Sequence, residues 1–314
     1  MSPLTDTMPS ITPAAGGGRL LVRRSTAERR SWAGELALAV REVWESRELV
    51  GQLVLRDVRV RYHQAVMGFA WALFMPLLIV LSGTLVRVAM ATVSGNALAP
   101  QVLGSTAVKG IMWAFFAGAL GTGTQSLLAN KQLFTKLYFP REVLPLAAVL
   151  AQCVDTAIGG TALALLLPFL GGALTPALLW VPLLVALMFV FTLGVCLFTS
   201  CANLFFRDVK YIVQVLLTFG IFLTPVFFEP VMLGPVGGRL LMLSPISPMI
   251  EGMRLVVIEG HDLLRPLVVA NAKGVEVLSW TPWYLLYSAA WALGGLAVSM
   301  RIFRRSAVVF AEYA

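Results

Sequence analysis

Asp155 has the clearest chemical potential in this sequence, because it places a carboxylate inside a long apolar run. An ionised carboxylate in a bilayer core is costly unless it is paired or hydrated, so its side chain should face other helices or a water-filled cavity. Gln152 and Thr156 lie beside it, and Gly159 and Gly160 would let another helix approach closely. Three roles are open: a hydrogen bond between helices, with the carboxyl ionised or protonated, a pore-facing group that binds substrate hydroxyls, and a proton-coupled group. We favour the first, because intramembrane polar groups commonly join helices.

A second candidate is the pair Glu251 and Arg254, in the run SPISPMIEGMR at residues 244–254. Side chains three positions apart share a helix face and can form an ion pair. Prolines break the segment 229–262 into apolar pieces too short to span a bilayer, which indicates re-entrant or interfacial helices. Lipid tails offer these charges no partner, so we expect their face to point to a conduit or to headgroups. The pair would then close an outer gate; the alternative is an ordinary interfacial helix.

The run LRDVRVRYH at residues 55–63 sets basic residues directly before a membrane-length apolar run. On a helix its apolar residues share one arc and its basic residues the next, so the helix can lie in the headgroup layer. Asp57 stands four residues before Arg61, which predicts an ion pair between them. The other basic residues of the run are Arg56, Arg59 and His63.

Two further charged segments join apolar runs: NKQLFTKLYFPREVLPL at residues 130–146 and NLFFRDVKY at residues 203–211. Pro140 suits the first turn of a helix, and Glu142 suits the positive end of the helix dipole. Asp208 can cap the helix that follows it, next to the basic residue Arg207. Both segments can contact a partner protein, although a plain amphipathic turn and a structural cap are the alternatives.

Several kinds of chemistry find no support in this sequence. It contains no G-x-x-x-x-G-K-[ST] run, so the chain cannot bind ATP through a P-loop. Its two histidines, His63 and His261, stand in unrelated contexts, and Cys153, Cys196 and Cys201 show no metal or redox spacing. The net charge of +8 arises from basic residues at the ends of apolar runs, which indicates membrane topology rather than nucleic-acid binding.

The composition requires a helical integral membrane protein. Hydrophobic residues make up 58% of the chain and charged residues 13%, with a mean hydropathy of +0.83. A water-soluble domain does not need so much apolar surface, and a membrane β-barrel would alternate apolar and polar residues. We predict an all-α fold with six transmembrane helices, an N-terminal amphipathic interface helix, and short re-entrant helices between the fifth and sixth spans.

Three regions are expected along the chain. Residues 1–25 read as a disordered tail, residues 26–64 as cytoplasmic amphipathic and interface helices, and residues 65–314 as the six-span domain. The spans are expected near residues 66–90, 110–130, 140–170, 177–203, 209–228 and 283–300. Arg87 would snorkel to the outer interface at the end of the first span. Basic residues gather in the loops on the side of the termini, which places both termini in the cytoplasm.

These motifs resemble those of the permeases of ABC polysaccharide exporters, which export O-antigen, capsule, teichoic acid or galactan chains. The entry to the first span matches at Arg56, Asp57, Arg61, Tyr62, Gln64, Gly68, Trp71, Ala72 and Pro76. The loop before the third span matches at Tyr138, Phe139, Pro140, Arg141, Glu142, Leu144 and Pro145. The run NLFFRDVKY resembles the family's N-x-F-x-RD-x-x-Y loop, and Pro245, Ile250, Glu251, Gly252 and Arg254 match its gating region. Ser244 and Met253 depart from that region, where Asn and an aromatic residue are usual.

The resemblance covers about residues 49–314 and implies an ABC type-2 permease that works as a homodimer in the bacterial cytoplasmic (inner) membrane. Its substrate would be a lipid-linked polysaccharide. The chain itself would hold no cofactor, since ATP and Mg would bind to a separate ABC ATPase subunit. The residues expected to couple to that ATPase are Arg56, Asp57, Arg61, Tyr138, Phe139, Pro140, Arg141, Glu142, Arg207 and Asp208. The family usually starts close to the interface helix, which leaves the role of residues 1–50 open.

Three other functions remain as alternatives. The nearest is a drug or lipo-oligosaccharide exporter of the same class. A proton-coupled carrier or channel would use Asp155 as its working group, and transport that follows a proton gradient without ATP would favour it. A scaffold subunit without transport activity is the third alternative.

Overall fold

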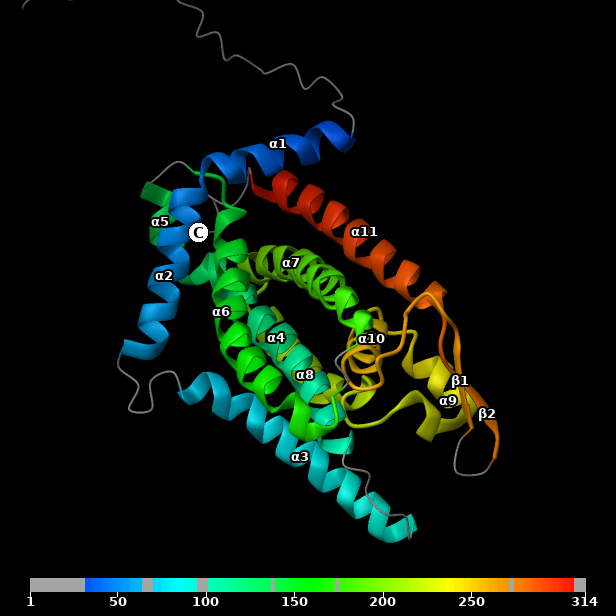
Figure 1. The fold of residues 1–314 in the computed structure, drawn as a ribbon. Helices are drawn as coiled ribbons and strands as arrows, with labels where there is room; N and C mark the ends of the chain where they lie inside the picture. Colours follow the sequence, from blue (N-terminus) through cyan, green and yellow to red (C-terminus); the bar gives the residue numbers. More distant parts are fainter. Residues whose placement is uncertain are drawn as a thin grey trace, which may run out of the picture.

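The computed structural model describes residues 32–63, 70–94, 101–136, 139–172, 175–270 and 274–307. Within these ranges the chain is mostly helical (Figure 1). The expected tail, the motif residues Gln64 and Gly68, and Tyr138 of the loop before the third span lie outside the described residues.

The longer elements follow one another as helices with short connections. They are α1 (Trp32–Glu45), α2 (Arg47–His63), α3 (Ala70–Ser94), α4 (Gln101–Ala129), α5 (Lys131–Lys136), α6 (Val143–Leu166), α7 (Val181–Phe205), α8 (Val209–Gly220), α9 (Gly234–Leu241), α10 (Ser247–Val257) and α11 (Pro282–Ala307). Short 3-10 turns stand between them: η1 (Leu167–Leu170), η2 (Pro176–Trp180), η3 (Ile221–Leu223) and η4 (Pro230–Leu233).

A small β-hairpin corrects the all-α prediction. Strand β1 (Leu267–Ala270) pairs antiparallel with β2 (Glu276–Trp280) just before α11. Both strands carry valine, a β-branched residue that fits a pleated surface, and Gly274 takes a positive φ of 73° between them. In β2 the side chains of Val277 and Trp280 are buried, so the hairpin covers part of the helical core.

Four helical segments are long and apolar enough to cross a membrane: Gln101–Ala129, Val143–Leu170, Pro176–Phe205 and Pro282–Ala307. They coincide with the predicted second, third, fourth and sixth spans. The first and fifth predicted spans contain shorter apolar helical stretches, Leu77–Val93 and Val209–Leu223. The last of these stops because Thr224 precedes Pro225 and takes an extended conformation, as residues before proline commonly do. The described chain is therefore that of a multi-pass membrane protein, and the count of six spans stays a prediction.

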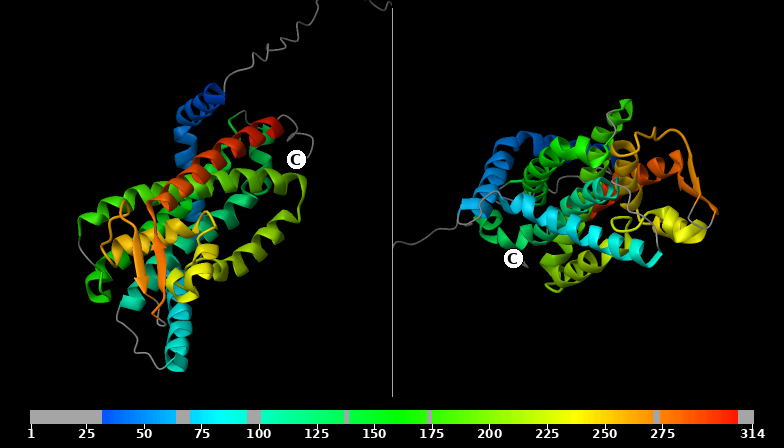
Figure 2. Two further views of the ribbon diagram at one scale, coloured as in Figure 1. Left: turned by 90° about the vertical axis from the view of Figure 1, so that its right-hand side faces the viewer. Right: turned by 60° about the horizontal axis from the view of Figure 1, so that its bottom comes forward.

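Helix α4 lies at the centre of the molecule and packs against α3, α6, α7, α8 and α10 (Figures 1 and 2). Its first turns carry the small residues Gly104, Ser105, Thr106 and Ala107, all buried, which let neighbouring helices approach closely. Helix α11 lies along α7 on the outside of this core. The largest apolar cluster joins α4, α7 and α10, so α4 connects the substructures that carry the functional residues.

The two ends of the bundle are identified by their charged contacts. At one end, called the α1 end, Arg304 near the C-terminus of α11 pairs with Glu42 of α1 and with Glu142 just before α6. At the other, called the α10 end, Arg87 of α3 pairs with Glu229 just before η4, and α10 packs on α4. A smaller apolar cluster that includes Leu53, Val143, Leu204 and Phe303 holds the helices together at the α1 end.

Candidate functional site

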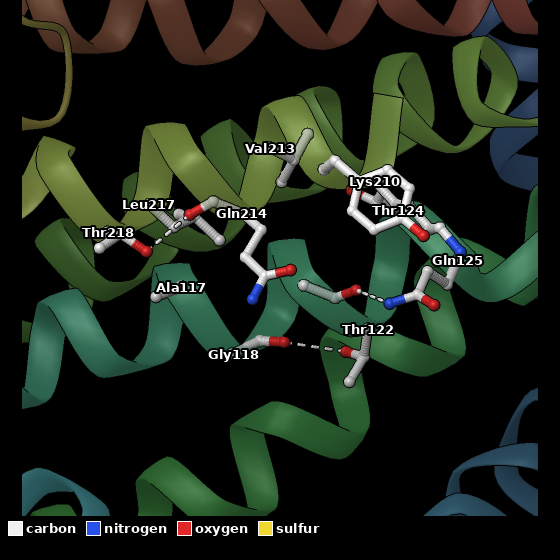
Figure 3. A pocket seen from close by; sticks show the side chains of 12 residues that line it. Ala117, Gly118, Thr122, Thr124, Gln125, Lys210, Val213, Gln214, Leu217 and Thr218 are labelled. Atoms are coloured by element: carbon white, nitrogen blue, oxygen red, sulfur yellow. Dashed lines mark hydrogen bonds between the residues drawn. The ribbon is translucent and has the colours of Figure 1, made fainter. Parts of the chain in front are cut away.

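A groove lined by both polar and apolar groups runs between α4 and α8 (Figure 3). Its volume is ≈ 630 Å³, within the range of small-molecule sites. On α4, Gly121 lines the groove without a side chain to fill it, and a Cβ added there would meet no atom within 4 Å; at Gly118, which also lines the groove, an added Cβ would meet Gln152 of α6 at 2.6 Å. The other lining residues are Ala117, Thr122, Thr124, Gln125, Lys210, Tyr211, Val213, Gln214, Leu217 and Thr218.

Hydroxyl and amide groups supply most of the polar side chains of this groove. Thr122 donates to the Gly118 carbonyl at 2.9 Å, and Thr218 donates to the Gln214 carbonyl at 2.9 Å. These hydroxyls give their protons to their own helices, so their oxygen lone pairs can accept hydrogen bonds from a ligand. Figure 3 shows the Gln214 amide pointing from α8 towards α4. Such a lining suits an uncharged ligand that carries many hydroxyl groups.

One cation and one aromatic ring stand together in the groove lining. The Lys210 amine lies 4.7 Å from the ring centroid of the neighbouring Tyr211. The lining therefore also offers a ring face and a positive charge to a ligand. Among the described residues no group of histidine, cysteine or carboxylate side chains could hold a metal ion.

The start of α8 is organised by Asn203 rather than by Asp208. The predicted cap Asp208 occupies the N-cap position but makes no side-chain capping hydrogen bond. Instead the Lys210 backbone N–H donates to Asn203 Oδ1 at 3.2 Å, and Asn203 Nδ2 donates to the Thr124 carbonyl at 3.2 Å. Asn203 is fully buried, so it can bridge α7, α4 and α8 and fix one end of the groove, whereas Asp208 and its neighbour Arg207 are exposed to solvent.

Asp155 is enclosed by side chains of the interface helix α2. Tyr62 donates to Asp155 Oδ1 at 2.5 Å, and Arg61 forms an ion pair with the same carboxylate. Arg61 also donates to Gln152 Oε1 at 3.2 Å. Burial, aided by the hydrogen bond and the charge of Asp155, raises the pKa of the Tyr62 hydroxyl to about 12. The carboxylate thus joins α2 to α6, which is the arrangement expected of a helix-linking group.

The predicted ion pair between Asp57 and Arg61 is wrong. Asp57 binds its neighbour Arg56 at 2.8 Å, while Arg61 turns to Asp155. The Asp57 side chain is 30% exposed to solvent, and the Asp155 side chain is 9% exposed. A charge pair that is shielded from water is stronger than an exposed one, so the buried carboxylate is the better partner for Arg61.

The loop before α6 is tied to α11 at the α1 end. Glu142 Oε1 accepts a hydrogen bond of 3.0 Å from Arg304 Nε, and Glu142 itself is buried. Arg141 donates to the Ala307 carbonyl, and Phe139 packs against the apolar cluster at this end. The described part of the predicted coupling loop, residues 139–142, is therefore held in place by the C-terminal helix of the same chain.

Glu251 and Arg254 form the predicted pair but do not face outward. Arg254 donates to Glu251 Oε1 from two nitrogens, at 2.8 and 2.6 Å. Glu251 is 0% exposed and Arg254 4%, and the whole of α10 is buried. The expectation that this polar face points to a conduit or to headgroups is wrong for the single chain, because the helix packs between α4 and α7.

The contacts of the other charged residues at the α10 end could not be predicted from local spacing. Arg87, expected to snorkel outward, is 4% exposed and binds Glu229 at 2.7 Å. Lys109 is 0% exposed and lies 3.9 Å from Glu229, and Arg254 binds Glu259 at 2.5 Å. The sequence does carry a signal for this pairing: three cations and three carboxylates stand singly beside apolar runs. Such charges in membrane proteins usually pair with one another.

The charge of Glu229 is held by its surroundings. Burial alone would raise the pKa of its carboxyl group, but Arg254, Lys109 and Arg87 outweigh that effect and lower the pKa to about 2. Glu229 thus stays ionised and serves as the common partner of two helices, α3 and α4.

Comparison with known proteins agrees with the motif resemblance. No family model matches the chain. The O-antigen export system permease protein RfbA of Myxococcus xanthus is 29% identical over 245 residues, which cover 77% of this chain and 92% of the relative. Two O-antigen export system permease proteins RfbA of Klebsiella pneumoniae are 26% and 25% identical over 217 residues, 68% of this chain and 81% of each relative. These matches confirm the resemblance to exporter permeases that the motifs indicated.

Proposed function

We propose that this permease-like chain is the transmembrane subunit of an ATP-driven exporter that moves a lipid-linked polysaccharide across the cytoplasmic membrane. The observation that carries the proposal is the groove between α4 and α8. Hydroxyl and amide groups line part of this groove, although the helices that form it are apolar. The similarity to O-antigen export permeases supplies the substrate class.

A sugar polymer fits the chemistry of the groove. Sugar hydroxyls both donate and accept, as do glutamine amides and threonine hydroxyls, so Gln125, Gln214 and Thr122 can replace part of their hydration. The ring of Tyr211 can pack against the apolar face of a sugar. A conduit for a moving chain needs many weak contacts rather than one strong site, because the polymer must leave each contact as easily as it enters.

The open side of the groove argues for a second copy of the chain. Along α8, the side chains of Ile212, Val215, Leu216 and Phe219 are exposed and form an apolar face beside the polar lining. A second permease chain seated on this face would enclose the groove and keep lipid tails away from its polar groups. We therefore propose a homodimer with its conduit between the two chains.

Energy would enter at the α1 end from a separate ABC ATPase with bound ATP and Mg. Charged residues stand there on α2 and on the loop before α8: Arg56 and Asp57 are half-buried, and Arg207 and Asp208 are exposed. Residues 139–142 lie at the same end. Basic residues near span ends favour the cytoplasm, so this end and both termini are placed on the cytoplasmic side.

The groove is tested by two matched substitutions. In Gln214→Leu the groove loses an amide, and surface polysaccharide on intact cells should fall by about fivefold, the size of one lost hydrogen bond. Thr218→Val should reduce export to a smaller degree. Thr161→Val on α6 is the control, because its exposed hydroxyl also donates to its own helix, at 2.7 Å, but lies outside the groove.

Membrane levels of each variant are measured alongside export. Normal export by Gln214→Leu, or an equal loss in Thr161→Val, would remove the groove from the transport path. Co-purification with a separate ABC ATPase subunit, and stimulation of its ATP turnover by polymer, tests the exporter as a whole. Efflux of amphipathic drugs without any effect on the polymer would favour the drug-exporter alternative.

A further inference from the structure

Six charges meet at the α10 end, and all but the exposed Glu259 are buried or half-buried. Arg87 of α3, Lys109 of α4 and Arg254 of α10 supply three cations, and Glu229, Glu251 and Glu259 supply three carboxylates. The charges balance, as a buried cluster requires. The three carboxylates nevertheless differ in their contacts: some join residues close in the sequence, and one joins separate elements of the fold.

Glu251 and Glu259 make local contacts. Both bind Arg254, and all three residues lie within nine positions of the chain on or directly after α10. An ion pair inside one helix stabilises that helix but does not fasten it to another element. The Glu251–Arg254 pair therefore cannot by itself close a gate between helices.

Glu229 makes the long-range contacts. One of its oxygens, Oε1, accepts from Arg87 at 2.7 Å and from Ser105 at 3.2 Å, and it lies 3.9 Å from Lys109. Arg87 also donates to the Phe227 carbonyl at 3.3 Å. The segment 227–229 is thereby fastened to both α3 and α4.

The packing around these contacts leaves no spare room. A Cβ added at Gly83 of α3 would lie 2.5 Å from Thr106 of α4 and 2.9 Å from the Phe227 ring. Thr106 is 0% exposed. The three elements touch closely beside Glu229, so Thr106 and Phe227 are shielded from solvent, while the Glu229 side chain itself is 20% exposed.

Two buried atoms are available to pair with each other when Glu229 leaves Lys109. Lys109 Nζ and Glu251 Oε2 have no hydrogen-bond partner among the described residues. Glu251 lies on α10, which packs against α4, the helix that carries Lys109. If Glu229 moves away, Glu251 can take over the lysine without leaving an unpaired buried charge.

We infer that Glu229 is a latch: it holds the segment 227–229 against α3 and α4, and its release from Arg87 and Lys109 opens the α10 end. The inference rests on the proposed function only in making this end the exit of the conduit. The closed contact itself can be measured without polymer or ATPase, so failure of the latch and failure of the exporter assignment are distinguishable.

The test uses Thr106→Cys as a reporter in full-length protein reconstituted in lipid nanodiscs. A charged maleimide labels accessible thiols, and mass spectrometry quantifies labelling at each cysteine. We expect the reporter to be silent alone and to label on the order of 100-fold faster after Glu229→Gln, because removing one partner of a buried ion pair shifts an equilibrium by at least that factor. Native Cys196, which is 0% exposed, should stay unlabelled and shows that the protein remains folded.

Glu259→Gln is the matched control. It removes a carboxylate from the same network, but one whose ion pair is with Arg254 on the adjoining helix, so the reporter should stay silent. A silent reporter in Glu229→Gln, or equal labelling in Glu259→Gln, would overturn the latch. If Cys196 labels as well, Glu229→Asp is measured instead: it keeps the charge and retracts the carboxylate, and a silent reporter there would also overturn it.

Discussion

The two charged networks at opposite ends of the molecule differ mainly in the burial of their cations, since each end holds both buried and partly exposed carboxylates. At the α1 end, the side chains of Arg304 and Glu42 keep 25% and 48% of their exposure. At the α10 end, Arg87 and Arg254 keep 4% and 5%, and Lys109 keeps none. Exposed pairs are weak and adjustable, whereas buried pairs are costly to break because a lone charge is left behind. The first network therefore suits transmission of small forces and the second suits a lock.

The strongest test of whether burial sets the strength of these ion pairs is to remove a buried cation. Arg87→Met leaves Glu229 with Lys109 at 3.9 Å and removes the guanidinium that binds it directly. We expect the free energy of unfolding to fall by about 3 kcal/mol or more, the usual cost of orphaning a buried charge. Arg41→Met is the control, since Arg41 is in a pair whose side chains keep 76% and 61% of their exposure. Denaturant titration of both reconstituted variants measures the difference, and equal losses would show that burial does not set the strength.

Acid pH should weaken the same network. The pKa of Glu229 is lowered from 4.5 to about 2, so its contribution to stability is complete above pH 4.5 and is lost as the pH falls through 2. The loss should approach roughly 3 kcal/mol, given the size of the pKa shift. Unfolding is followed between pH 6 and 2 for the native protein and for Glu229→Gln. A native protein whose stability falls no more steeply than that of the variant would contradict the assignment.

These contacts also mark where sequence reasoning stops. Run length indicated the four long apolar helices, and helical spacing indicated the Glu251–Arg254 pair, because both are local properties of the chain. Spacing could not indicate that Arg61 reaches Asp155 or that Arg87 reaches Glu229, since those partners are brought together by helix packing. Local reasoning also gave the wrong partner for Asp57 and the wrong cap for α8, because a buried group elsewhere offered a better contact.

The Arg61–Asp155 pair is intermediate in burial between the exposed and the buried ion pairs, because its side chains are 30% and 9% exposed. Substitutions of Asp155 therefore test an effect of intermediate size. Asp155→Asn still accepts a hydrogen bond from Tyr62 and should fold and export. Asp155→Leu should lower the free energy of unfolding by about 1 kcal/mol, the scale of hydrogen bonds within membranes. Asp57→Asn, at the half-buried pair with Arg56, is the control for stability and should change the free energy of unfolding little. Loss of export in a stably folded Asp155→Asn protein would support the proton-coupled carrier.

The partner hydroxyl of Asp155 predicts an alkaline limit. The pKa of Tyr62 is raised from 10.0 to about 12, so its contribution is complete below pH 10 and is lost as the pH rises through 12. Ionised Tyr62 would repel Asp155 and can no longer donate to it. Tyr62→Phe should remove this pH dependence, as measured by unfolding between pH 9 and 12. A pH dependence that persists in Tyr62→Phe would assign it to another group.

The smallest effect on stability is expected at the α1 end, yet it should be visible in function. The double variant Arg141→Ala with Glu142→Ala should fold and insert but export poorly, if residues 139–142 transmit ATPase motion. Because Glu142 binds Arg304, Arg304→Gln breaks the same contact without altering the loop. It should cost less than about 1 kcal/mol of stability and less still at high salt.

The decisive quantity for Arg304 is polymer exported per ATP hydrolysed. A contact that transmits motion changes this ratio, whereas a contact that only stabilises the fold changes the amount of protein. We expect Arg304→Gln to lower the ratio and the neighbouring exposed Arg305→Gln to leave it unchanged. Normal export by the double variant would show that the loop does not couple the two subunits. A low ratio in that variant with a normal ratio in Arg304→Gln would place coupling in the loop itself, independent of its attachment to α11.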